Sequence, residues 1–131
     1  LCLTRTNVVL CDGLVTARVM IVGEAPGATE DEVGLPFVGR SGQLLIRLFG
    51  EIGIEREDIY IANVLKCRPP ENRNPLPIEI KSCSAFLESQ INFVSPQVIV
   101  PVGNFATRYV LNTKEGITKF SEWWFENGKK V

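Results

Sequence analysis

The chain has 131 residues, of which 45% are hydrophobic and 22% are charged, and this predicts one soluble globular domain over residues 1–131. The net charge of −1 argues against a protein that coats nucleic acid non-specifically, although a small basic patch can still hold one stretch of backbone. The apolar runs are too short to span a bilayer and no signal peptide is visible, so we expect an intracellular, cytoplasmic protein that contacts no membrane.

Four cysteines occur in the chain, and no two of them have C-x-x-C spacing, so a zinc-finger site is not indicated. An intracellular chain is not expected to join them as disulfides. The chain contains no histidine, which removes the commonest general base and metal ligand. The cysteines are Cys2, Cys11, Cys67 and Cys83.

After a turn expected at Cys11 to Gly13, the run Val19 to Val22 predicts a strand buried on both faces. It stops at Gly23, and Glu24 follows as the single carboxylate of a Gly- and Pro-rich turn. In open α/β sheets, ligands bind where the chain leaves the carboxyl end of a strand. Glu24 is therefore a candidate catalytic residue, and the alternative is a solvated carboxylate on a tight turn.

Residues 28–32 are predicted to form an acidic loop. The following stretch, residues 33–40, contains three glycines or prolines, which exclude a regular helix. Phe37 then lies on a loop near Glu24, either as a plug of the core or as a platform for a flat ligand.

Apolar residues from Leu44 to Ile52 recur at helical spacing, with Ser41 as the expected N-cap and Gly53 as the terminator. Arg40 and Ser41 then lie at a helix N-terminus, where a phosphate can bind.

A second strand is predicted from Asp58 to Asn63. Asn63 either caps a turn or reads the hydrogen-bonding edge of a ligand. Beyond it, one local basic cluster can hold phosphates of DNA, and its members are Lys66, Arg68 and Arg73.

The rest of the chain continues the alternation of helices and strands. We expect a helix at about residues 77–92 with Cys83 facing inward, a strand at 98–100, a short helix capped by Asn104, an Asn127-Gly128 hairpin turn and the start of a further strand at Val131. This alternation predicts a three-layer α/β/α sandwich with a central parallel sheet. Right-handed crossovers would place Glu24, Asn63 and Gly103 at one rim of that sheet.

Three strings together resemble the family 4 uracil-DNA glycosylases, the iron–sulfur branch of their superfamily. Gly-Glu-Ala-Pro-Gly at 23–27 with Glu30-Asp31 is similar to the family's first motif, and residues 34–45 are similar to its uracil-stacking loop and following helix. Residues 63–70 with 72–75 are similar to its second signature. The resemblance covers nearly the whole chain.

The resemblance implies a base excision repair enzyme that hydrolyses the N-glycosidic bond of uracil in DNA. Glu24 falls on a catalytic or positioning carboxylate, for which we expect the role of orienting a water molecule. Phe37 falls on the stacking aromatic and Asn63 on the uracil-reading amide. The residues expected to contact the base are Gly23, Ala25, Glu30, Phe37 and Asn63.

The family's [4Fe–4S] cluster takes four cysteines, and the resemblance assigns two of them to Cys67 and Cys83. Alignment with the family places the other pair just before Leu1. Cys2 and Cys11 do not stand at its positions, and the alternative is that one of them substitutes as a ligand. A His-Pro-Ser-like loop is expected after Val131. The chain is accordingly expected to be a fragment truncated at both ends, with weak or no activity alone.

Two alternatives remain open. One is a non-catalytic uracil- or DNA-binding module of a replication- or repair-associated protein. The other is a small electron carrier built on Cys67 and Cys83, against which the adjacent basic cluster argues. As partner we expect uracil-containing DNA, bound by a monomer.

Overall fold

The computed structural model describes residues 1–115, 125–126 and 129–130, and a four-stranded sheet of order β1-β3-β2-β4 forms its centre. β2 (Val19–Gly23) lies parallel to both β3 (Tyr60–Asn63) and β4 (Val98–Pro101). β1 (Asp12–Gly13) pairs antiparallel with β3. The predicted parallel arrangement is confirmed for three strands. The turn predicted at residues 11–13 is wrong, because β1 pairs there and makes the sheet mixed.

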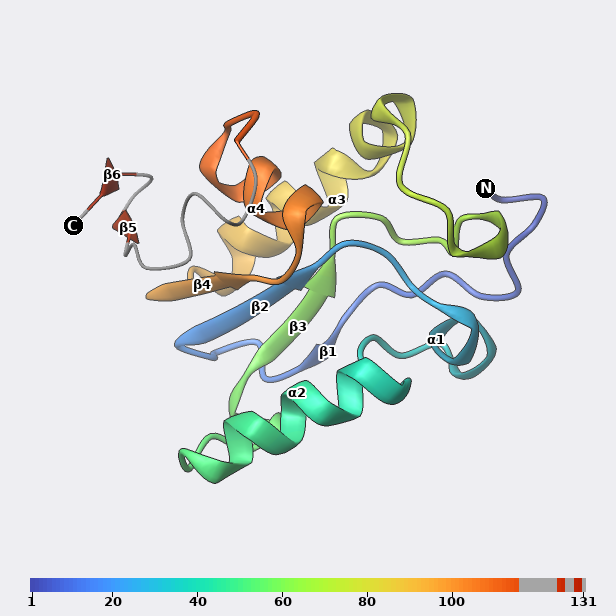
Figure 1. Ribbon diagram of the computed structural model, residues 1–131. Helices are drawn as coiled ribbons and strands as arrows, with labels where there is room; N and C mark the ends of the chain where they lie inside the picture. Colours follow the sequence, from blue (N-terminus) through green and yellow to red (C-terminus); the bar gives the residue numbers. More distant parts are fainter. Residues whose placement is uncertain (116–124, 127–128, 131) are drawn as a thin grey trace.

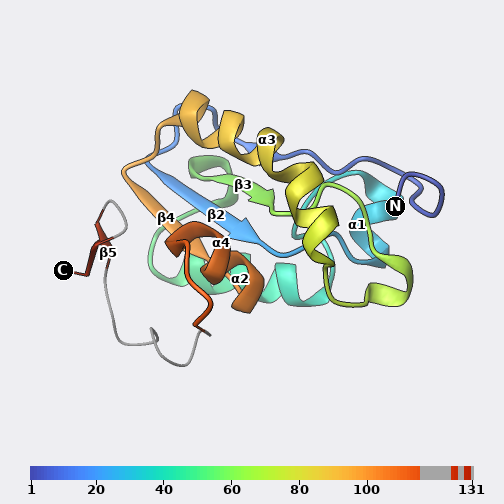
Figure 2. The same ribbon diagram turned by 90° about the horizontal axis from the view of Figure 1, so that it is seen from above.

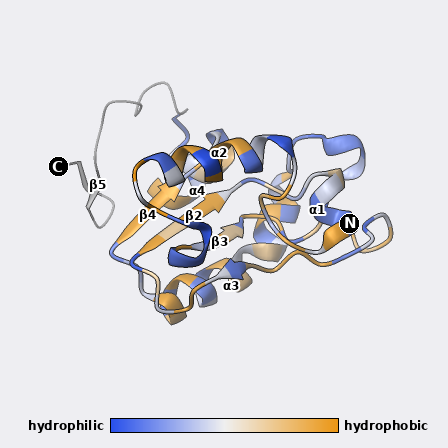
Figure 3. Cartoon of the chain, turned by 90° about the horizontal axis from the view of Figure 1, so that it is seen from below, coloured by the Kyte–Doolittle hydropathy of each residue, from blue (hydrophilic) through white to orange (hydrophobic). Residues whose placement is uncertain are grey.

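Helices cover both faces of this sheet (Figures 1 and 2), which confirms the predicted α/β/α layering. α2 (Arg40–Glu51) lies on one face, while α3 (Pro77–Val94) and α4 (Asn104–Leu111) lie on the other. Successive side chains of a strand point to opposite faces. Met20 accordingly packs in the α3–α4 cluster and Ile21 in the α2 cluster. The strands are correspondingly apolar, whereas α2 alternates between hydrophilic and hydrophobic residues (Figure 3).

Helix starts differ slightly from the sequence expectation. α2 begins at Arg40 after an extended Gly39, so Ser41 lies inside the first turn and is not the N-cap. α4 likewise begins at Asn104 itself, after Gly103 at the N-cap position. In both cases a glycine supplies the non-helical backbone that a polar N-cap residue was expected to supply.

The acidic loop predicted at residues 28–32 is wrong, because these residues belong to the helix α1 (Ala28–Val33). Glu30 and Asp31 lie in its first turn, where negative charge is favourable beside the unpaired N–H groups. Gly34 ends the helix with φ +85°, in the left-handed region that glycine adopts without steric cost.

The buried Asp31 of α1 fastens the N-terminal segment to the domain. Its carboxylate accepts hydrogen bonds from the backbone N–H groups of Thr6 (2.8 Å) and Asn7 (3.0 Å). The Asn7 side chain in turn donates to the Asp31 carbonyl oxygen (2.7 Å). Burial alone raises the pKa of Asp31, but these hydrogen bonds outweigh it and lower the pKa below its usual value.

At the other end of the described chain, β5 (Phe125–Glu126) pairs antiparallel with β6 (Lys129–Lys130). The predicted Asn127-Gly128 turn and the strand start predicted at Val131 lie outside the described residues. Within the part of the chain that the structure describes, no helix combines the length and apolar character that crossing a bilayer requires.

We expect Asp31→Asn to lower the free energy of unfolding at pH 7 by about 1–3 kcal/mol, because the new amide group presents N–H donors to the N–H of Thr6. The Asp31 carboxylate makes its full contribution to the free energy of unfolding above its pKa in the unfolded chain, which is about 4. This contribution is lost as the pH falls toward the lower pKa of the folded protein. Urea unfolding of both proteins between pH 7 and pH 3 measures this. The exposed neighbour variant Glu32→Gln is the control, and an equal loss there would contradict the role of Asp31.

Candidate active site

Parallel pairing brings the carboxyl ends of three strands to one rim of the sheet. Gly23 is in register with Asn63, and Val22 with Pro101. The residues that follow each strand therefore meet at this rim, where open α/β sheets bind ligands.

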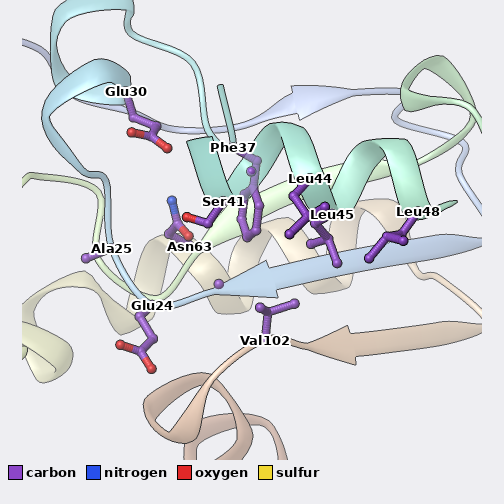
Figure 4. A pocket seen from close by; sticks show the side chains of 12 residues that line it. Glu24, Ala25, Glu30, Phe37, Ser41, Leu44, Leu45, Leu48, Asn63 and Val102 are labelled. Carbon is purple, nitrogen blue, oxygen red and sulfur yellow. The ribbon is translucent and has the colours of Figure 1, made fainter. Parts of the chain in front are cut away.

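A cavity of about 310 Å³ opens at this rim (Figure 4), within the range of about 300–1,000 Å³ typical of ligand sites. One part of its wall is polar and the other apolar. The lining side chains with polar groups are Glu24, Glu30, Ser41 and Asn63; the apolar ones include Phe37, Leu44, Leu45, Leu48 and Val102. Gly23 and Ala25 complete the lining beside Glu24.

Phe37 and Asn63 meet above Gly23. A β-carbon added to Gly23 would lie 2.5 Å from the ring Cζ of Phe37 and would also collide with Oδ1 of Asn63. The ring and the amide therefore lie side by side over a position where no side chain fits. Phe37 also packs against the core cluster of Ile21, Ile59 and Ile61 on the α2 side of the sheet, so it contributes to the core as well as to the cavity wall.

The side-chain amide of Asn63 is available to a ligand. The residue is 3% exposed, yet within the described residues its amide makes no hydrogen bond. Buried polar groups are normally satisfied. Because the Asn63 amide has no partner in the described part of the chain, its N–H donor and its oxygen acceptor can both bind a ligand. In that part of the chain, the alternative in which Asn63 caps a turn has no hydrogen bond to support it.

Glu24 lines the same cavity, but its side chain points away from Phe37 and Asn63 (Figure 4). A β-carbon added to Gly103 would collide with Oε2 of Glu24 and lie 3.0 Å from its carboxyl carbon. The carboxylate thus lies against the N-terminal end of α4, where negative charge is favourable. Gly103 has φ +95°, so both its backbone and the space above it require glycine.

Glu30 lines the cavity from α1 and also joins two helix starts. Its Oε1 accepts a hydrogen bond from the Gly39 N–H (3.2 Å) at the start of α2. β-carbons added to Gly27 or Gly39 would lie 3.0–3.1 Å from its carboxylate oxygens. Glu30 therefore holds α1 and α2 together at the cavity rim.

The sequence expectation for Lys66 as a phosphate-binding residue is wrong. Lys66 is 2% exposed, and its Nζ donates to the Asn63 carbonyl oxygen (2.7 Å) and to Oε1 of Gln90 (2.6 Å). Burial lowers the pKa of Lys66 to about 8. The Lys66 side chain lies inside the domain, where its hydrogen bond to the Asn63 carbonyl oxygen stabilises the end of β3.

The other predicted phosphate contacts remain near the surface. Arg68 donates through Nε to Asn72 (2.9 Å), and Arg73 pairs with Glu79 through two hydrogen bonds of 2.8 and 2.9 Å. The Arg73 bonds hold the pKa of Glu79 at about 2. Arg40 and Ser41 are exposed in the first turn of α2, and Ser41 also lines the cavity.

Cys67 and Cys83 are half-buried free thiols. Burial raises the pKa of Cys67, an effect that Arg5 opposes and the neighbouring Cys83 adds to. The described residues contain no group of three or more His, Cys, Asp or Glu side chains placed to hold a metal ion. Cys83 belongs to neither hydrophobic core cluster, so its inward orientation stays a prediction.

Sequence reasoning missed the apolar wall of the cavity. Leu44 and Leu48 were assigned no role beyond their helical spacing, and the structure shows that they are 47% and 48% exposed and line the cavity. The signal was the width of the apolar stripe, which exceeds what one packed helix face needs.

Comparisons with known proteins agree with this geometry. The sequence profile of the uracil DNA glycosylase superfamily matches residues 12–129. The chain is 48% identical, over 98% of its length, to the type-4 uracil-DNA glycosylase of Thermotoga maritima. It is 49% identical, over 83% of its length, to the type-4 enzyme of Archaeoglobus fulgidus.

The chain spans 69% of the Thermotoga protein and 55% of the Archaeoglobus protein. It is also 36% identical, over 79% of its length, to a DNA polymerase of Bacillus phage SP01, of which it covers 11%.

We expect Gly23→Ala to lower the free energy of unfolding by about 1–3 kcal/mol, because the new methyl group forces Phe37 and Asn63 apart. Gly50→Ala is the matched control. Its β-carbon would meet only Oε1 of Glu55 at 3.9 Å, so it should raise stability by about 0.5–1 kcal/mol through helix propensity. Urea unfolding measures both, and equal effects would contradict the close packing over Gly23.

Proposed function

The chain belongs to the uracil-DNA glycosylase superfamily, and from this we propose that it excises uracil from DNA by hydrolysing the N-glycosidic bond. One observation carries the proposal. The amide of Asn63 makes no hydrogen bond among the described residues, and it lies beside the ring of Phe37 in a cavity that Glu24 also lines. That arrangement suits one flat base with a hydrogen-bonding edge.

A base inside a duplex must leave the stack before it can enter such a cavity. Phe37 offers a face on which the extruded base stacks, which contributes about 1–3 kcal/mol per base. The Asn63 amide carries both a donor and an acceptor, and these match O4 and N3–H of uracil. Cytosine presents the opposite pattern and would leave the buried amide mismatched, which such a site strongly rejects.

Cleavage develops positive charge on the sugar and negative charge on the departing uracil. Glu24 is a carboxylate that lines the cavity and points away from Phe37 and Asn63. We propose that a base stacked on Phe37 directs its sugar toward this carboxylate. Glu24 then orients the attacking water and stabilises the developing positive charge.

Arg40, Ser41, Arg68 and Arg73 are the residues we propose for contacts with the DNA backbone. They are polar or cationic side chains in the first turn of α2 and after β3, both of which flank the cavity. We further propose that the protein acts as a monomer on DNA inside the cell, without contact to a membrane.

Cys67 and Cys83 are the residues we propose as two of four thiolate ligands of an iron–sulfur cluster. They neighbour each other, but the described residues assemble no group of three or more His, Cys, Asp or Glu side chains there, whereas such a cluster needs four ligands. When bound, the cluster would fasten the chain after β3 to α3. No step of the cleavage depends on it.

A second candidate function is a uracil- or DNA-binding module without catalysis. The similarity to a small part of a phage DNA polymerase favours it. The two candidates differ in a single measurement, because the module binds uracil-containing DNA without releasing the base.

We expect Glu24→Gln to lower single-turnover release of uracil by about 10²–10⁴-fold, because an amide cannot accept the proton of the attacking water. The assay uses the full-length protein and a uracil-containing oligonucleotide, and it detects alkali-labile abasic sites. Glu32→Gln removes the same charge outside the cavity and should cleave normally. Full activity of Glu24→Gln would refute the water-orienting role, and a wild-type protein that binds but does not cleave would favour the module.

Arg68→Ala should weaken DNA binding for every sequence and reduce the slope of log affinity against log salt concentration by about one. Titrations of a fluorescent oligonucleotide at several salt concentrations measure this. Arg18→Ala is the matched control, because Arg18 precedes β2 at the opposite end of the sheet and bonds Gln97. If both variants change the slope equally, Arg68 is not a specific phosphate contact.

A further inference from the structure

We propose that Arg56, backed by Asp12, is a positioning residue that fixes the Phe37 ring beside the Asn63 amide. The inference rests on the proposed function, since it concerns how the base platform is held. Arg56 does not line the cavity at the rim, so its effect on cleavage passes through Phe37.

The Phe37 loop needs an external support. Phe37 itself has φ +55°, in a region that residues with a side chain seldom adopt. Gly42 of α2 lies directly against its backbone, since an added β-carbon there would be 2.5 Å from Cα of Phe37. The loop is thus pressed against α2 on one side and depends on other contacts to keep its unusual conformation.

One guanidinium supplies those contacts. Arg56 donates through Nη1 to the Phe37 carbonyl oxygen (3.0 Å) and through Nη2 to the Pro36 carbonyl oxygen (2.6 Å). Its Nε donates to Oδ2 of Asp12 (2.9 Å). The planar fork of arginine is suited to several acceptors at fixed angles. Two consecutive loop carbonyls are therefore held by a side chain that is itself held by a carboxylate.

The Arg56–Asp12 pair and its hydrogen bonds to the loop, here called the bracket, also connect Phe37 to Asn63. Arg56 lies in the short 3-10 turn η1 (Arg56–Asp58), which leads into β3, and β3 ends at Asn63. Asp12 belongs to β1, where it pairs with Ile61 of β3. Arg56 precedes β3 and Asp12 lies on the strand paired with β3, and β3 carries Asn63. The ion pair therefore fixes the Phe37 ring relative to the Asn63 amide.

Loss of the bracket would leave the ring room to move. A second, open hollow of about 390 Å³ has Phe37, Ile46 and Arg56 among its lining residues. Phe37 thus lines both hollows. Without the bonds from Arg56, the loop loses the contacts that hold its two carbonyl groups, and the ring loses its fixed place beside the Asn63 amide.

A double-mutant cycle in the full-length protein tests this proposal. Arg56→Ala should lower kcat/KM for a uracil-containing oligonucleotide by about 10–100-fold, the cost of a misplaced binding group. In a Phe37→Ala background the same change should cost less than about twofold, because the two residues act as one unit. Arg56→Lys should recover part of the loss, since an ammonium can reach one of the carbonyls.

A readout independent of activity uses fluorophenylalanine-labelled protein. The fluorine resonance of Phe37, assigned with Phe37→Leu, should shift or broaden in Arg56→Ala. It should not change in Arg47→Ala, which removes a guanidinium from the same second hollow without touching the loop carbonyls. An unchanged resonance in Arg56→Ala overturns the inference.

Equal fold losses from Arg56→Ala in the wild-type and Phe37→Ala backgrounds also overturn the inference, while leaving the proposed function intact. If the wild-type protein releases no uracil, the proposed function is overturned, and so is the claim that Arg56 affects cleavage through Phe37. The two failures are therefore distinguishable.

Discussion

The site depends on a close approach at the end of the central strand. Gly23 carries no β-carbon, and the ring of Phe37 and the amide of Asn63 occupy the space that one would fill. Parallel pairing brings Asn63 into register with Gly23, and the loop between α1 and α2 brings Phe37 over it. The strand pairing thus positions Asn63 directly, whereas the helices α1 and α2 position Phe37 through the loop that joins them.

Around that approach, polar groups are arranged in supporting roles. Lys66 holds the Asn63 carbonyl from inside the domain, and Glu30 holds the start of α2. Asp31, one residue further along α1, fastens the N-terminal segment. The buried charges of Asp31 and Lys66 are stable because each makes at least two hydrogen bonds. Together these groups fix the segments that surround the cavity.

Most of the strands and helices could be predicted from the sequence, because the patterns that indicate them involve residues close together in the chain. The apolar runs of β2 and β4 and the helical stripe of α3 depend on neighbouring residues. The glycine-rich turn after β2 and the polar Asn63 at the end of β3 likewise indicated where the cavity lies. Resemblance to a known family then assigned a role to each, roles that remain predictions until the variants are measured.

What the sequence did not show depends on contacts between distant segments. α1 has only six residues and no apolar periodicity, and its Asp31 is held by residues about 25 positions earlier. Lys66 was expected to be a surface cation, because nothing in the neighbouring sequence indicated that Gln90 would accept a hydrogen bond from its ammonium group. Arg56 was overlooked for the same reason, since its acceptors come from residues 12, 36 and 37.

The half-exposed leucines of α2 have a consequence for how a guest would be held. Water against Leu44 and Leu48 finds few hydrogen-bonding partners and is released at a gain when an apolar surface replaces it. Water at Asn63, by contrast, is replaced without loss only by a group that restores its hydrogen bonds. The leucine side chains therefore favour any apolar surface, whereas the Asn63 amide favours only a ligand with a matching hydrogen-bonding edge.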